Sequence, residues 1–160
     1  MTTTHPSPFR YTEAVVQAGP PAVIASPAEL PVFRVISYGL RWRPVPVDVQ
    51  LAIDLRSLIT NPMHLSWLRG QTGFDWDVRE FVMNAGGTED VLAHTADLAE
   101  LVAQQITPIR QAVGIGIGCD WGRQRSVVVA AELASRWNAA GIPTEAIHLD
   151  IQRPLPADHA

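Results

Sequence analysis

The sequence predicts an α/β domain in which a mainly parallel sheet is flanked by helices. Short runs of β-branched residues alternate along the chain with amphipathic stretches at helical spacing, and this order is typical of parallel α/β folds. The chain has 160 residues, of which 47% are hydrophobic. That length and composition suit one soluble domain with a single core.

The domain is expected to begin at residue 32. Residues 1–31 hold six of the 13 prolines and show no sustained periodicity, so we expect a mobile arm with at most one helical turn over residues 12–18. The compact domain then covers residues 32–151, and residues 152–160 are expected to form a flexible tail.

Two strands open the domain. Residues 32–37 alternate apolar and polar side chains, and residues 49–55 form a second apolar run. Asp54 and Arg56 lie at the carboxyl end of that run, which is where ligands bind in open α/β sheets. The link between the runs is short for a helical crossover, so the direction of the first strand stays open.

Residues 57–76 are irregular, and such a stretch inside a domain is usually functional or mobile. A short helix over residues 77–84 should bury Val78, Phe81 and Val82 before the glycines at 86 and 87. Thr88 is a candidate cap for the next helix, which should end before Pro108. The apolar face predicted for that helix consists of Val91, Leu92, Thr95, Leu98, Val102 and Ile106.

The centre of the chain is a strand over residues 113–118, a tight turn, and a helix over residues 127–140. The strand alternates Gly114, Gly116 and Gly118 with larger residues, and we expect a helix to pack closely against this glycine face. A last short strand covers residues 145–150.

The turn after the central strand has the chemistry of an oxyanion site. Gly118 and Gly122 would let backbone N–H groups approach a ligand, the following helix presents its positive end, and Arg125 and Ser126 add donors. A phosphate is the best candidate. In the structural alternative, Ser126 caps the helix and Arg125 pairs with Asp54 or Asp150. Arg56 and Arg69 are evenly balanced between ion pairs and ligand contacts.

A cysteine phosphatase is the alternative interpretation. The turn contains Cys119 followed by Gly122 and Arg125, a spacing at which a thiolate attacks phosphorus while an arginine holds the oxygens. Asp75 or Asp77 would be the general acid. A single cysteine at a strand end is otherwise a small buried apolar residue.

Several classes are excluded or disfavoured. The chain has no lysine, so it has no Walker A motif, and the three alternating glycines lack dinucleotide-motif spacing. One cysteine and five dispersed histidines predict no disulfide and no metal site, and no cofactor is expected. A net charge of −4 argues against a broad nucleic-acid surface. The lack of a membrane-length apolar run or a signal peptide predicts a cytoplasmic protein.

From residue 32 to about residue 151 the chain resembles the C-terminal domain of the RNase adapter protein RapZ. The matching pieces are Ser37-Tyr38-Gly39, Asp54-Leu55-Arg56, Asn61-Pro62, Leu68-Arg69, Thr72-Gly73, Ile117-Gly118-Cys119, Gly122, Arg125-Ser126-Val127 and His148-Leu149-Asp150. They occur in the family's order across nearly the whole expected domain.

This resemblance implies a fold similar to the sugar-phosphate part of phosphofructokinase, without catalytic activity. It also implies binding of an amino-sugar phosphate, glucosamine 6-phosphate, and of small regulatory RNA that is passed to an endoribonuclease. Family members self-assemble, so a homo-oligomer without membrane contact is expected.

This sequence departs from the family at several positions. Residues 1–31 stand where the family has a P-loop kinase-like domain, which predicts a stand-alone domain. Met63 and Gln124 replace histidines, with His64 one place after Met63. Asp120 and Trp121 stand where the family tends to have a hydroxyl residue and glycine, and the tail is not basic.

We therefore expect a non-catalytic sensor or adaptor domain that binds a phosphorylated small molecule. RNA contacts are assigned to Arg41, Arg43 and Arg123. The expected ligand-binding residues come from the turn, from the second strand's end and from the irregular segment: Cys119, Asp120, Trp121, Gly122, Arg123, Gln124, Arg125, Ser126, Arg56, Asn61, His64 and Thr72.

Overall fold

The computed structural model describes residues 32–106 and 112–157, and the arm, the turn over residues 12–18 and the last three tail residues lie outside that part. The elements follow one another as β1 (Val32–Gly39), β2 (Leu51–Asp54), η2 (Pro62–His64), η3 (Ser66–Leu68), α1 (Trp76–Asn84), α2 (Thr88–Ile106), β3 (Ala112–Cys119), α3 (Arg125–Ala139) and β4 (Thr144–His148). This confirms the α/β class. In the described part, no helix is long and apolar enough to cross a membrane.

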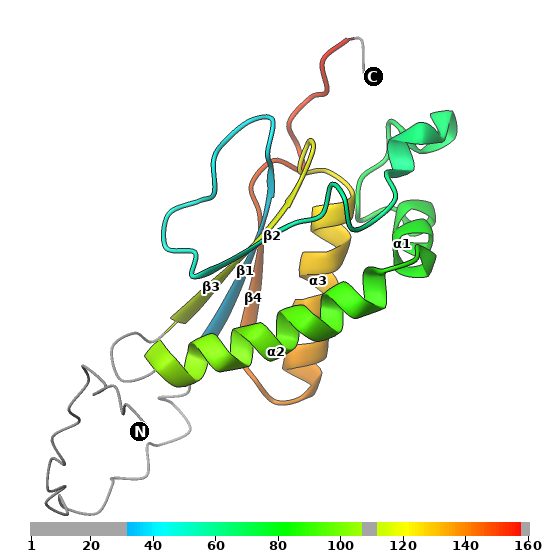
Figure 1. The fold of residues 1–160 in the computed structure, drawn as a ribbon. Coiled ribbons are helices and arrows are strands. Elements are labelled where there is room, and N and C mark those ends of the chain that lie inside the picture. Colours follow the sequence, from blue (N-terminus) through cyan, green and yellow to red (C-terminus); the bar gives the residue numbers. More distant parts are fainter. Residues whose placement is uncertain (1–31, 107–111, 158–160) are drawn as a thin grey trace, which may run out of the picture.

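The sheet has four strands in the order β2-β3-β1-β4, and every neighbouring pair is parallel (Figure 1). The direction of β1, which the sequence leaves open, is therefore the same as that of the other strands. In the register of the sheet, Gly39 pairs with Cys119 and Ser37 pairs with His148. All four carboxyl ends consequently meet at one edge of the sheet.

The link from β1 to β2 explains the glycines of β3. Because β3 lies between these two strands, residues 40–50 must cross over it. A Cβ atom on Gly114 would lie 2.0 Å from the carbonyl oxygen of Asp48, and one on Gly118 would lie 3.1 Å from the Leu40 side chain. The prediction that a helix covers the glycine face is wrong, because this link packs there.

The helices lie on the opposite face of the sheet (Figure 1). The larger residues of β3, Val113, Ile115 and Ile117, are fully buried there and belong to one apolar core with residues of α2 and α3. The two faces of β3 thus have different partners. Side chains meet helices on one face, and bare backbone meets the 40–50 link on the other.

The start and the buried face of α2 differ from the prediction. The helix begins at Thr88, whose hydroxyl donates to the carbonyl of Val82 at 2.6 Å, so Thr88 ties α2 to α1 instead of capping it. Leu92 and Thr95 are buried as predicted, but Leu98 is 43% exposed and Ala99 is buried in its place. The buried stripe passes through Ala99 and Ala103, small residues that let the helix approach the sheet.

Candidate anion-binding site

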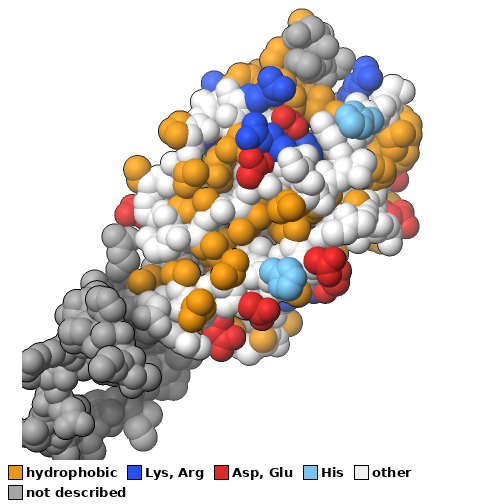
Figure 2. Space-filling model, in the orientation of Figure 1, with side chains coloured by type: hydrophobic (Ala, Val, Ile, Leu, Met, Phe, Trp, Pro, Cys, Tyr) orange, Lys and Arg blue, Asp and Glu red, His pale blue; other side chains and the backbone are white. Residues whose placement is uncertain are grey.

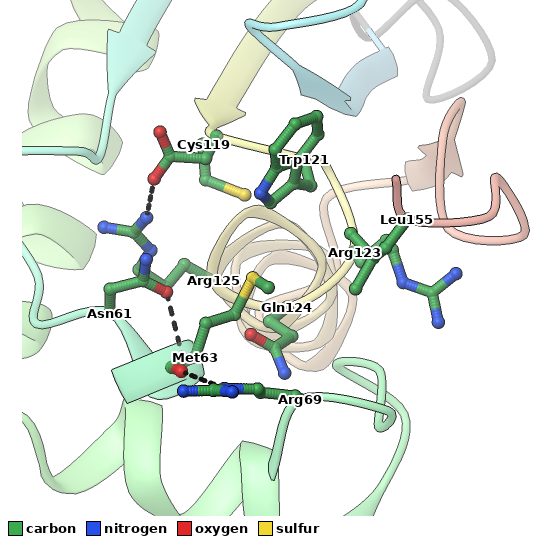
Figure 3. A pocket seen from close by; sticks show the side chains of 10 residues that line it. Asn61, Met63, Arg69, Cys119, Trp121, Arg123, Gln124, Arg125 and Leu155 are labelled. Atoms are coloured by element: carbon green, nitrogen blue, oxygen red, sulfur yellow. Dashed lines mark hydrogen bonds and ion pairs between the residues drawn. The ribbon is translucent and has the colours of Figure 1, made fainter. Parts of the chain in front are cut away.

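Three adjoining depressions lie where the strands end, with volumes of about 10, 320 and 510 Å³. Asn61 and Asp120 line all three. The first is enclosed by the turn after β3 and by the segment that precedes α1, as Figure 3 shows from close by. The topology therefore brings the central turn and the irregular segment together, although about 60 residues separate them in the chain.

The charge of these depressions is strongly positive for an acidic protein. Within the described residues, their walls contain one acidic side chain, Asp120, together with His64 and five arginines: Arg41, Arg56, Arg69, Arg123 and Arg125. Figure 2 shows basic side chains gathered with a few acidic ones toward the carboxyl edge of the sheet. Converging positive charge of this kind raises the local concentration of anions.

Arg125 forms the base of the site and is almost completely buried, with 3% of its side chain exposed. One terminal nitrogen donates to the carbonyl of Ile59 at 2.9 Å. The other donates to Asp120 Oδ2 at 2.5 Å (Figure 3). The predicted structural pairing with Asp54 or Asp150 is wrong, because the partner is five residues away in the same turn.

Three other residues of the turn are buried and bonded inside the protein. The Cys119 sulfur lies 3.1 Å from the Ser126 hydroxyl. Gln124 donates its side-chain amide to the carbonyl of Leu68 at 2.7 Å. Ser126 is fully buried beneath the turn and does not line the depressions.

Gly122 is required by the packing of the chain against itself. Its φ of +72° is in the left-handed region, and a Cβ atom would lie 2.5 Å from the backbone nitrogen of Gly39. Gly118 packs against Leu40, as described above. Both glycines were expected to make room for a ligand, but protein atoms fill that room in each case.

The aromatic rings beside the turn pack against each other and against arginines. The centroids of Trp42 and Trp121 lie 5.0 Å apart, and the Trp42 indole donates to the Trp121 carbonyl. Arg41 lies over Trp121, and Arg153 lies over Trp42 at 4.2 Å. This stack forms one wall of the edge.

Of the three arginines assigned to RNA, Arg41 is the most open, with 55% of its side chain exposed. Arg43 donates twice to the buried carboxylate of Asp150, at 3.0 and 2.7 Å. Asp150 also accepts the backbone N–H of Gly39. Arg123 donates to the carbonyl of Arg153, and its guanidinium points away from the first depression (Figure 3).

The residues expected to close the pocket are only partly brought together. Asn61 caps η2 through the Met63 N–H and lines every depression, and His64 lines two of them. Arg56 is held by Asp54 at 2.7 Å and lines one. Thr72 lines none of the three, and both its N–H and its hydroxyl donate to Asp75.

Arg69 is the clearest addition to the predicted site. It follows η3, donates to the Met63 carbonyl at 3.1 Å, and lines two of the depressions (Figure 3). The sequence signal was the Leu68-Arg69 pair among the family pieces, which by itself could not distinguish a ligand contact from an ion pair. Met63 and Leu155 also line the first depression.

The residues assigned to a phosphatase make other contacts in this structure. Hydrogen bonds from the Thr72 N–H and hydroxyl lower the pKa of Asp75, whereas a general acid needs a raised one. Asp77 lines a different depression, beside Trp67. The arginine of the motif, Arg125, is turned to Asp120 and Ile59.

The structure is a parallel α/β domain with arginine-lined depressions at the carboxyl edge of its sheet. The family model for the RapZ C-terminal domain matches residues 31–152. The chain belongs to this family, as its motifs indicate.

The curated relatives it matches include nucleotide-binding proteins from several bacteria. The chain is 34% identical to one from Streptomyces coelicolor over 120 residues, which are 74% of this chain and 40% of that protein. It is 32% identical to one from Ruminiclostridium cellulolyticum over 123 residues, which are 76% of this chain and 42% of that protein. The chain thus spans about two fifths of the length of these relatives.

Proposed function

We propose that this domain binds a phosphorylated small molecule at the carboxyl edge of its sheet and acts as a non-catalytic regulatory or adaptor module. The observation that carries the proposal is the convergence of five arginines on adjoining depressions that contain a single carboxylate. Asp120 pairs with Arg125 and Asp54 pairs with Arg56, but the arginines still outnumber these carboxylates. The excess positive charge favours a ligand with more than one negative charge, such as a phosphate ester.

The depression of about 320 Å³ is the best place for the phosphate. Arg41 and Arg69 both line it, and Asn61 and His64 add further polar groups to its wall. The first turn of α3 lies close by, and the side chain before it, Gln124, makes no capping bond to this helix. The positive N-terminal end of the α3 dipole therefore adds to the positive field of the arginines.

The finer assignment is an amino-sugar phosphate of the glucosamine 6-phosphate type, as the family resemblance implies. A nucleotide is the competing ligand class, because the relatives are named nucleotide-binding proteins. Both ligands present a phosphate to the arginines and differ in the group that fills the adjoining depression.

Isothermal titration calorimetry with glucosamine 6-phosphate, glucose 6-phosphate and a nucleoside monophosphate tests the proposal. Arg69→Ala should weaken binding of the preferred ligand by about 10- to 100-fold, as expected for one charge-assisted hydrogen bond. Arg136→Ala is the matched control, because it removes the same charge at a position away from the depressions. Arg136 lies on α3 and pairs with Glu89 of α2. Equal binding by wild type and Arg69→Ala, or no binding of any phosphate, would contradict the proposal.

Small regulatory RNA is a second candidate ligand. Arg41 and Arg153 are both exposed and lie over the tryptophan stack, which places positive charge and aromatic rings on one wall of the edge. Such a wall suits single-stranded RNA. Gel shifts at low salt should weaken steeply as salt rises and should weaken further in Arg41→Ala. A gel shift whose affinity changes neither with salt nor with Arg41→Ala would contradict RNA binding through this surface.

A further inference from the structure

Asp120 occupies an unusual position for an acidic residue. Within the described part of the chain, it is the one carboxylate that lines the three depressions, and it lines all of them. Its Oδ2 accepts a hydrogen bond from Arg125 at 2.5 Å, and its Oδ1 lies 3.6 Å from the Arg41 Nε. The carboxylate therefore stands between the buried cation and an exposed one.

The pair with Arg125 is built into the protein. Arg125 is 3% exposed, and the nitrogen that does not touch Asp120 donates to the carbonyl of Ile59. Asp120 remains 21% exposed, so it separates this guanidinium from solvent. A buried guanidinium needs a counter-ion, and here the protein itself supplies one.

An incoming phosphate would compete with this internal carboxylate. Its oxygens would bind the same two arginines, Arg41 and Arg125. Its charge would also lie close to that of Asp120 in a partly buried site, where like charges repel more strongly than in water. The carboxylate thus lowers the affinity of the site for simple anions while it keeps Arg125 satisfied.

We infer that Asp120 is an internal competitor for the anion site and sets its affinity and selectivity. This inference rests on the proposed function, since it concerns the same depressions. Its consequence is that removal of the carboxylate turns Arg125 into an available anion ligand. The site then becomes a tighter and less selective phosphate binder.

The test is titration of wild type and variants with inorganic phosphate at constant pH and ionic strength. Asp120→Asn keeps the size of the side chain and removes its charge, and it should bind phosphate at least about tenfold more tightly, which corresponds to 1.4 kcal/mol. Asp120→Glu keeps the charge and should bind no more tightly than wild type. An unchanged or weaker affinity in Asp120→Asn would overturn the inference.

Asp97→Asn is the matched control for net charge. Asp97 is exposed on α2 and lines none of the three depressions. Its removal should change phosphate affinity by less than about threefold, because the effect of an exposed charge is screened. A gain equal to that of Asp120→Asn would attribute the effect to net charge and overturn the inference.

The outcomes also separate this inference from the proposed function. Phosphate binding by Asp120→Asn without binding of any phosphorylated ligand by wild type would support the inference and contradict the proposed function. Ligand binding by wild type with no gain in the variant would do the reverse, and no binding by either would contradict both. If loss of the counter-ion destabilises the variant, thermal unfolding gives the same answer, because phosphate should then raise the Tm of Asp120→Asn more than that of wild type.

Discussion

Single atoms decide which residues β3 can contain. The backbone of the 40–50 link lies so close to this strand that a methyl group on Gly114 would overlap the Asp48 carbonyl at 2.0 Å. A backbone atom cannot rotate away as the end of a side chain can, so the link itself would have to move. Glycine at this position therefore reflects steric exclusion in the folded state and not a need for a special backbone angle.

Gly114→Ala is expected to lower the free energy of unfolding by about 2 kcal/mol or more, because overpacking of this kind typically costs about 1–3 kcal/mol. The measurement is the midpoint of urea unfolding. Gly70→Ala is the control, since no heavy atom lies within 4 Å of the added methyl group. Similar midpoints for the two variants would show that the link does not press on the strand.

At the scale of elements, packing decides which side of a helix is buried. Periodicity places α2 as an amphipathic helix, and its buried stripe runs through Leu92, Thr95 and Ala99. Leu98 comes one residue before Ala99, lies to one side of the buried stripe and is 43% exposed. Hydropathy alone favours a leucine over an alanine for burial, but the helix approaches the sheet through its small residues.

Leu92 and Leu98 of α2 should respond very differently to truncation. Leu92 is 1% exposed within the core, and Leu92→Ala should cost about 2–4 kcal/mol because it leaves a cavity. Leu98→Ala should cost less than about 1 kcal/mol, since half-exposed surface substitutions have small effects. Urea unfolding of both variants checks this, and equal losses would show that Leu98 belongs to the core.

At the scale of the whole molecule, contacts across the sheet edge join distant parts of the chain. His148 at the end of β4 lies 2.8 Å from the Ser37 hydroxyl of β1, and the ring of Phe74 meets it edge-on at 5.1 Å. Burial lowers the pKa of His148 below its ordinary value of 6.5. One imidazole therefore links two strands and the segment before α1 in its neutral form.

This burial predicts a loss of stability in mild acid. Between the lowered pKa and 6.5 the unfolded chain binds more protons at His148 than the folded chain does, so the free energy of unfolding falls as the pH decreases through that window. The slope contributed by one group is at most about 1.4 kcal/mol per pH unit.

Urea unfolding from pH 7.5 downward measures this effect, and His148→Gln should flatten the profile above the range in which carboxylates titrate. His94, exposed on α2, gives the control His94→Gln, which should leave the profile unchanged. A profile that keeps its slope in His148→Gln would assign the acid sensitivity to other groups.

The sequence alone predicts the α/β class, the four strands of the described sheet and its three α-helices, because hydropathy periods and turn residues are local properties of the chain. It also identifies the turn at residues 119–126 and the arginines around it as the chemically distinctive region. It does so from residue type and spacing.

Only the tertiary structure decides which groups those residues meet. Arg125 pairs with Asp120, Arg43 pairs with Asp150 across 107 residues, and the glycines of β3 face a link instead of a helix. These choices depend on strand order and on the path of residues 40–50. Contacts between distant segments arise only when the whole chain packs, so no local pattern contains them.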